Sequence, residues 1–153
     1  MNRTMRLQER AIGDDEIRRI LENGDWGVLS TAGRDAYPYG VPLSYVVIGD
    51  RLYIHGSNVG HKIDNIGHNP RVSFCVVGDT RVQPEMFDRD FESVVLFGRA
   101  RVVTGPEKRE AMEAFMNKYC GPLVGPAREH LDRHIDKIFV VRIAIERMTG
   151  KAH

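Results

Sequence analysis

A loop of small and polar residues between residues 55 and 70 holds the side chains best suited to chemistry. It reads His-Gly-Ser-Asn-Val-Gly-His-Lys-Ile-Asp-Asn-Ile-Gly-His-Asn-Pro and follows a predicted strand. The pattern predicts that a helix begins near His61, and the first N–H groups of a helix attract anions. The residues that could surround a phosphate are Gly56, Ser57, Gly60 and Lys62. The same pattern also fits a turn capped by Ser57 or Asn58, with a solvated Lys62.

The elements that must position this loop are mostly strands joined by tight turns. Strands are predicted at 26–31, 37–48, 51–55, 71–77, 91–103 and 137–146, and helices at 14–23, 61–67, 104–119 and 126–134. Residues 78–90 are predicted to be a polar connection. Because the strands do not alternate regularly with helices, the pattern favours an antiparallel sheet over a doubly wound one. We therefore predict a mostly β fold, a six-stranded antiparallel barrel with flanking helices.

Length and composition set further limits. The chain has 153 residues, which predicts one domain over 1–153, and its net charge of +1 gives no basic surface for nucleic acid. No apolar run approaches the roughly 20 residues of a membrane span. The charged N-terminus lacks the apolar core of a signal peptide, so a cytoplasmic location is expected. Cys75 and Cys120 form no motif and are expected to be reduced thiols.

Other motifs with chemical meaning are weak or missing. His130 and His134 have the i, i+4 spacing of a zinc-binding helix, but the glutamate of that motif is absent, so a solvated helix face is expected. The six histidines are irregularly spaced, and no metal site is predicted. The chain contains neither Gly-x-Gly-x-x-Gly nor Gly-x-Ser-x-Gly, so neither a dinucleotide fold nor hydrolase chemistry is indicated.

A series of short motifs resembles the FMN-binding split β-barrel family, which includes pyridoxamine 5'-phosphate oxidase and the Nim-type nitroimidazole-resistance proteins. The Nim-type branch is the more similar one. The matching pieces, in order, are Tyr37-Pro38, Pro42-Leu43, Tyr53-Ile-His-Gly56, Gly60-His-Lys62, Asn69-Pro-Arg-Val72 and Ser93-Val-Val-Leu-Phe-Gly-Arg-Ala100. The oxidase branch has an Arg-Lys pair where this chain has His61-Lys62. A neutral imidazole binds phosphate less tightly than a bidentate guanidinium, which weakens that part of the match.

The resemblance implies an FMN site with defined contacts. Lys62 and His61 would hold the phosphate, aided by Ser57 and the backbone of Gly60, and His55 and Gly56 would lie beside the ribityl chain or the ring edge. The residues that would line the isoalloxazine ring are Val41, Pro42, Leu43 and Ser44, and Ser93 would add a polar contact. From the residues alone, Pro42-Leu43 could be a bulged strand that packs the core, and His55 could be a core or interface histidine.

The resemblance also implies a function and an assembly. A homodimer would hold FMN between its subunits, since a small barrel filled by its own side chains has no room for a flavin. The chain would be an FMN-dependent oxidoreductase that reduces a small aromatic compound, with nitro compounds suggested by the Nim-type branch and His55 as a proton donor. The alternatives are a non-catalytic flavin or haem binder and a deazaflavin-dependent reductase. Oxidase activity on pyridoxamine phosphate is disfavoured, because the C-terminus lacks the basic substrate motif of that branch.

Overall fold

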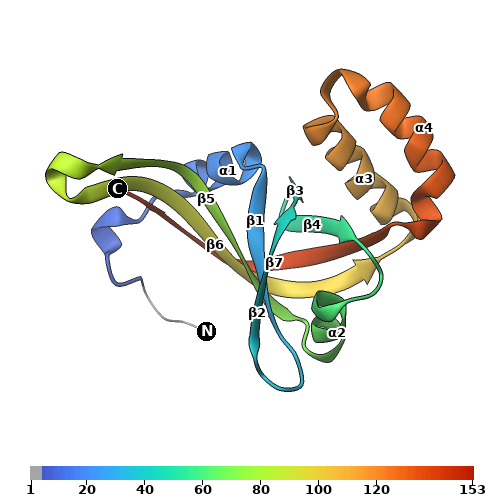
Figure 1. The fold of residues 1–153 in the computed structure, drawn as a ribbon, viewed down its shortest axis with the longest axis horizontal. Helices are drawn as coiled ribbons and strands as arrows, with labels where there is room; N and C mark the ends of the chain where they lie inside the picture. Colours follow the sequence, from blue (N-terminus) through green and yellow to red (C-terminus); the bar gives the residue numbers. More distant parts are fainter. Residues whose placement is uncertain (1–4) are drawn as a thin grey trace.

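The fold is an antiparallel sheet with helices packed around it (Figure 1). The structure, a computed structural model, describes residues 5–153. Its strands are β1 (Trp26–Ala32), β2 (Pro38–Ser44), β3 (Val46–Ile48), β4 (Arg51–Gly56), β5 (Arg71–Gln83), β6 (Asp88–Val103) and β7 (Phe139–Ala152). Its α-helices are α1 (Asp14–Asn23), α2 (His61–His68), α3 (Gly105–Tyr119) and α4 (Val124–His134). The prediction of a mostly β, antiparallel fold is confirmed.

The strand order explains how the sheet closes on itself. The order is β2-β1-β5-β6-β7-β4-β3, and every neighbouring pair is antiparallel. The two outermost strands, β2 and β3, are consecutive in the chain and are separated only by Tyr45. The sheet therefore curls until its two edges meet end to end at this residue. β2 pairs with β1 on one side, and its other edge opens toward β4 and α2.

The predicted count of six strands is wrong, because the segment 37–48 forms two strands. Tyr45 breaks it: its N–H donates to the Tyr119 hydroxyl at 3.2 Å, and its carbonyl accepts from that hydroxyl at 2.7 Å. Lys118 Nζ also donates to the Tyr45 carbonyl, at 3.3 Å. The backbone of Tyr45 is thus bonded to side chains of α3 instead of a neighbouring strand, which gives seven strands in place of six.

The predicted polar connection at 78–90 is also wrong. β5 continues to Gln83 and β6 begins at Asp88, and the two pair across a short 3-10 turn at Pro84–Met86. They form a long hairpin that projects from the barrel at the end opposite α3 and α4 (Figure 1). Most side chains of this hairpin are exposed on both faces, so the sequence lacks the alternation by which a half-buried strand is recognised. β7 likewise extends beyond the predicted end, to Ala152.

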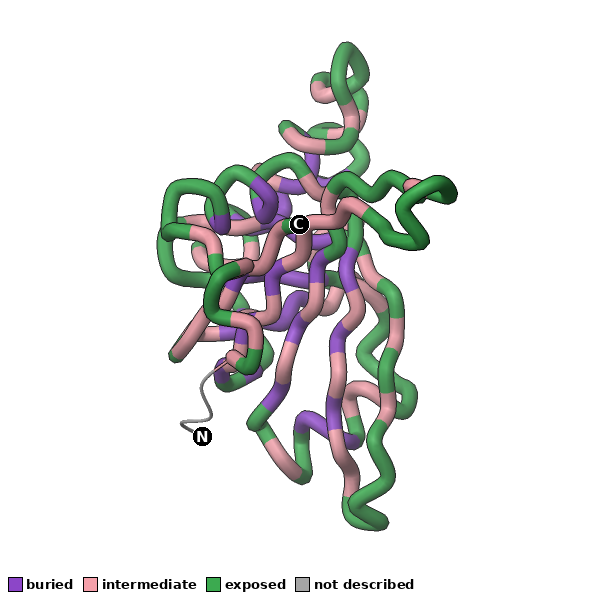
Figure 2. Tube along the Cα trace, turned by 90° about the vertical axis from the view of Figure 1, so that its left-hand side faces the viewer, coloured by how far each residue is buried: buried purple, intermediate pink, exposed green. Residues whose placement is uncertain are grey.

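Two apolar clusters hold the fold together. One fills the barrel and includes Leu29, Phe74 and Leu96, all fully buried, and α1 covers it with Ile17, Ile20 and Leu21. The other lies under α3 and α4 and includes Met112, Phe115 and Leu131. Buried and partly buried residues alternate along the strands, as expected for a sheet with one covered face (Figure 2). None of the helices in residues 5–153 is long and apolar enough to cross a membrane.

Candidate functional site

The predicted phosphate loop leads directly into α2. Gly60 precedes the helix with φ 120°, a conformation that favours glycine, and nothing lies within 4 Å of where a Cβ would stand. The Gly60 carbonyl accepts the first helical bonds, from the N–H groups of Ile63 at 2.9 Å and Asp64 at 3.2 Å. The N–H groups of His61 and Lys62 come before these bonds and have no place in the helical pattern. They are available to an anion above Gly60.

Lys62 places a positive charge beside this helix start. Its Nζ lies 3.8 Å from the position that a Cβ of Gly56 would occupy, so the side chain reaches back over the end of β4. Within residues 5–153 the ammonium group makes no hydrogen bond or ion pair. Ser57 accepts a bond from the Val59 N–H at 3.3 Å, which shapes the loop between them. A phosphate fits this set of donors, because the free N–H groups and an unpaired cation face one loop.

His61 is held differently from Lys62. Its ring lies on Tyr39 of β2, with 4.2 Å between the ring centroids and 36° between their planes. This contact ties the start of α2 to the open edge of β2. The two side chains that were predicted to hold the phosphate therefore have different positions. Lys62 covers the loop, and His61 joins the loop to β2. No local sequence pattern marks the contact between Tyr39 and His61.

β2 supplies the opposite wall of this corner. Its side chains alternate, so Val41 and Leu43 are half-buried against the barrel core while Pro42 and Ser44 are exposed. β2 has only one strand neighbour among the described residues, β1, so backbone groups on its other edge lack a strand partner. Such groups can bond the polar edge of a flat heterocycle. Residues 41–44, which were predicted to contact the flavin ring, thus present backbone atoms along the free edge of β2. Of their side chains, only those of Pro42 and Ser44 are on the outer face.

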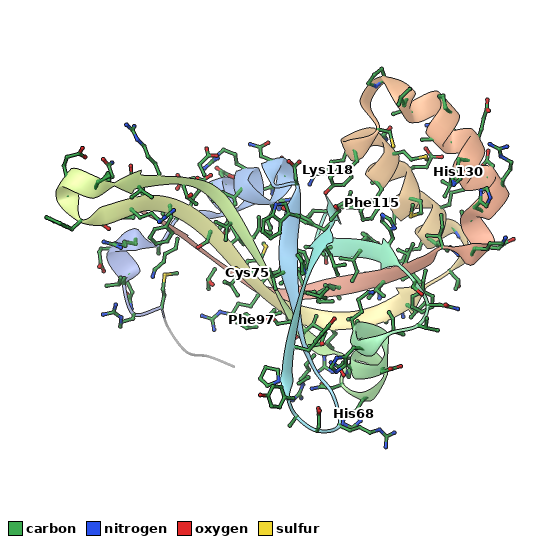
Figure 3. All side chains as sticks on the ribbon, viewed as in Figure 1. His68, Cys75, Phe97, Phe115, Lys118 and His130 are labelled. Atoms are coloured by element: carbon green, nitrogen blue, oxygen red, sulfur yellow. The ribbon has the colours of Figure 1, made fainter. Side chains whose placement is uncertain are left out.

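His55 stands at the end of β4, next to the loop. Its ring meets Phe115 of α3 edge to face, with the centroids 4.5 Å apart. Burial lowers the pKa of this imidazole below its ordinary value, so the ring is neutral near pH 7. The residue remains partly open to solvent. Phe115 (labelled in Figure 3) stacks in turn on Tyr119, with 5.9 Å between the ring centroids, so two aromatic rings of α3 follow one another beside His55.

Ser93 is not near these groups within one chain. The C-terminal end of β6, at Val103, pairs with Val140 of β7, which pairs with His55. Ser93 lies ten residues earlier on β6, or about 33 Å along the strand. It sits beside Val77 and Lys151, near the projecting hairpin. The structure therefore brings together the predicted residues of β2, β4 and α2, whereas Ser93 lies ten residues along β6 from the level of His55.

The two histidines of α4 contact each other. His130 and His134 stack with their centroids 4.2 Å apart, and His134 Nδ1 is 2.9 Å from the His130 carbonyl oxygen. Throughout the described part of the chain, no three potential ligands among His, Cys, Asp and Glu come together. Cys75 and Cys120 are free thiols, and burial raises the pKa of Cys75.

Comparison with known proteins agrees with this architecture. A family model described as pyridoxamine 5'-phosphate oxidase matches residues 13–152. The chain belongs to the pyridoxamine 5'-phosphate oxidase family. A curated relative, the uncharacterized protein RA0666 of Rhizobium meliloti, is 34% identical over 90 residues. That match covers 59% of this chain and 54% of the relative, so it spans about half of the relative's length.

Solved structures share the fold over nearly the whole chain. A FAD-binding protein of Mesorhizobium loti is 26% identical, with a TM-score of 0.69. The match covers 94% of this chain and 97% of the Mesorhizobium chain. A candidate 5-nitroimidazole antibiotic resistance protein of Bacteroides thetaiotaomicron is 22% identical with a TM-score of 0.75, covering 93% and 86%. A FAD and haem binding protein of Mycobacterium smegmatis is 16% identical with a TM-score of 0.72, covering 92% and 71%. The split-barrel prediction is confirmed, apart from the strand count, and similar folds bind flavin and in some cases haem.

Proposed function

We propose that this member of the pyridoxamine 5'-phosphate oxidase family binds FMN and reduces a small aromatic compound. The observation that carries the proposal is the meeting of three elements at one corner: the open edge of β2, the end of β4 and the start of α2. The similarity to a FAD-binding protein supports a flavin. The similarity in fold to the Bacteroides protein makes nitroaromatic compounds the first substrates to test.

The phosphate of FMN would be bound by Lys62 and by the N–H groups that open α2. Such charge-assisted bonds contribute about 1.5–3 kcal/mol each. Gly60 keeps the approach open, since no side chain stands above it, and Ser57 holds the loop through the Val59 N–H. His61 would support this site from its place on Tyr39. The isoalloxazine ring would lie along residues 41–44 of β2, next to His55 and Gly56.

When bound, the flavin would supply the electron transfer, and the side chains would orient the reactants and manage protons. His55 is suited to the second task, because its imidazole is neutral near pH 7 and remains open to solvent. A neutral imidazole can hydrogen-bond a polar group of the substrate and relay a proton to it. Phe115 contacts the His55 ring edge to face and would shield one side of it from water.

A second copy of the chain would complete the site. Ser93 lies on β6, ten residues along the strand from Val103, the residue of β6 that is level with His55. If Ser93 contacts the flavin, it does so from the other subunit of a homodimer. Measuring the molar mass in solution by light scattering tests this step, with a dimer expected. A monomer that still binds FMN would remove Ser93 from the site.

The flavin assignment is tested with the purified protein. We expect the two visible absorption bands of an oxidised flavin after FMN is added, one FMN per chain, and a higher melting temperature. FAD, in which this phosphate carries an AMP group, serves as the competitor. After anaerobic reduction with dithionite, a nitroimidazole should reoxidise the bound flavin. A colourless protein that neither binds FMN nor gains thermal stability would contradict the proposal, and haem and deazaflavin would then be tested.

A further inference from the structure

A cavity opens on the outer face of the sheet where two strands separate. β1 and β5 pair only from Val28 to Ser30, opposite Cys75 to Ser73, and beyond that point the two strands diverge. The opening has a volume of about 490 Å³, in the range of small-molecule sites. None of the residues predicted to contact the flavin lines this cavity.

Two arginines stand side by side at the rim of the cavity. Arg71 of β5 and Arg99 of β6 are direct cross-strand partners, which places their Cβ atoms about 4.5–5.5 Å apart. Arg99 Nε donates to Glu146 at 2.8 Å, whereas the Arg71 side chain has no hydrogen bond or ion pair among residues 5–153. Like charges directly opposite each other destabilise a sheet. One carboxylate faces two guanidinium groups, so a further anion would offset the remaining charge.

The rest of the lining matches a ligand with one flat apolar side. Phe97 contributes a half-buried ring (labelled in Figure 3), and Ala32 and Pro38 add apolar surface. Ser30 and Ser73, cross-strand partners, add two hydroxyls that make no hydrogen bond within the described chain. The cavity thus combines an aromatic wall, hydroxyl donors and an unpaired guanidinium.

We propose that this cavity binds a small aromatic carboxylate, with the carboxylate on Arg71 and the ring against Phe97. A guanidinium holds a carboxylate through two parallel bonds, which suits an arginine with no other partner. The ring would lie in the gap between β1 and β5 and displace water from Phe97, Ala32 and Pro38. This site is distinct from the flavin corner, and the proposal does not depend on flavin binding.

The test is a titration of the full-length protein with benzoate, followed by ¹H–¹⁵N NMR. Benzoate should shift the amide signals around Ser30, Ser73 and Phe97, while benzamide, the neutral isostere, should shift none of them. Arg71→Gln should weaken benzoate binding about tenfold or more, since it removes a charge-assisted pair. Arg81→Gln, a change to another exposed arginine of the same strand, is the matched control and should leave the affinity unchanged.

Four results would overturn the proposal. Equal binding of benzoate and benzamide would show that the guanidinium does not select the ligand, and equal losses in Arg71→Gln and Arg81→Gln would place the ligand elsewhere. Inorganic phosphate binding as tightly as benzoate would remove the role of Phe97. A second copy of the chain seated in the cavity would leave no benzoate binding at all, which would also contradict it.

Discussion

Two lysines of this chain, Lys118 and Lys62, lie in contrasting environments. Lys118 of α3 donates to the Gly24 carbonyl at 2.6 Å and to the Tyr45 carbonyl at 3.3 Å, and its Nζ lies 4.3 Å from the centre of the Tyr45 ring. Lys62 of α2 has no such partners in the described chain and reaches over Gly56 beside a helix start. One ammonium group is satisfied by the fold, and the other is left for a ligand.

This difference separates a structural cation from a binding one. Lys118 ties together three segments that are distant in sequence: the turn after α1, the break between β2 and β3, and α3. Partial burial lowers the pKa of its ammonium, so its hydrogen bonds must offset a cost of desolvation. Lys62 stabilises nothing visible in the fold. We therefore expect substitutions of the two lysines to affect different properties, one the free energy of unfolding and the other the affinity for FMN.

The largest expected effect is on stability, from Lys118→Met. This change keeps the length of the side chain but removes two bonds from a charged donor, so we expect the free energy of unfolding to fall by about 2–3 kcal/mol. Urea unfolding followed by circular dichroism measures it. Lys62→Met is the comparison and should change stability by no more than about 0.5 kcal/mol. Equal losses for the two variants would break the distinction between the lysines.

A smaller loss is expected from Tyr45→Phe, in the same network. The Tyr45 hydroxyl donates to the Leu21 carbonyl at 2.7 Å in a fully buried position. Its removal should lower the free energy of unfolding by about 1–2 kcal/mol, because a buried acceptor loses its donor. FMN affinity should stay as in the wild type. A loss of FMN affinity without a loss of stability would show that the break between β2 and β3 belongs to the binding site.

The smallest expected effect concerns the protonation of His55. Because burial lowers its pKa below about 6.5, the unfolded chain binds more protons between the folded and unfolded pKa values. The contribution of His55 therefore raises the free energy of unfolding as the pH increases through that window. Urea unfolding of the wild type and His55→Gln, between about pH 5 and pH 7.5, should show a steeper rise for the wild type. Parallel curves would mean that Phe115 does not desolvate the ring.

The two regions differ in how much of their structure could be predicted from the sequence. The loop from His55 to Lys62 could be found from the sequence because its glycines, its lysine and the start of α2 are neighbours along the chain. The network of Lys118 could not, since its partners are 73 and 94 residues away and no local pattern marks them. The break at Tyr45 depends on the same distant contacts, which is why 37–48 was expected to be one strand.

The cavity beside Arg71 and the projecting hairpin were missed for related reasons. The cavity arises where β1 and β5 separate, and strand divergence depends on twist and closure of the whole sheet. The hairpin has two exposed faces, so hydrophobic alternation is missing from Gly78 to Asp90. By contrast, β1, β4 and α1 were predicted within one residue of their observed bounds. Local signals therefore revealed the start of the site but not its walls.

The central claim is that Lys62 binds the phosphate of a flavin nucleotide. The most direct test compares the affinities of two ligands, one with the phosphate and one without it, for the wild type and a Lys62 variant. Dissociation constants are measured for FMN and for riboflavin, which lacks the phosphate, with the wild type and Lys62→Ala. Arg81→Ala, a change to an exposed cation on the projecting hairpin, is the control. We expect Lys62→Ala to weaken FMN binding about tenfold to a hundredfold and to leave riboflavin binding unchanged. Equal weakening of both ligands, or of neither, would contradict the assignment of Lys62 to the phosphate.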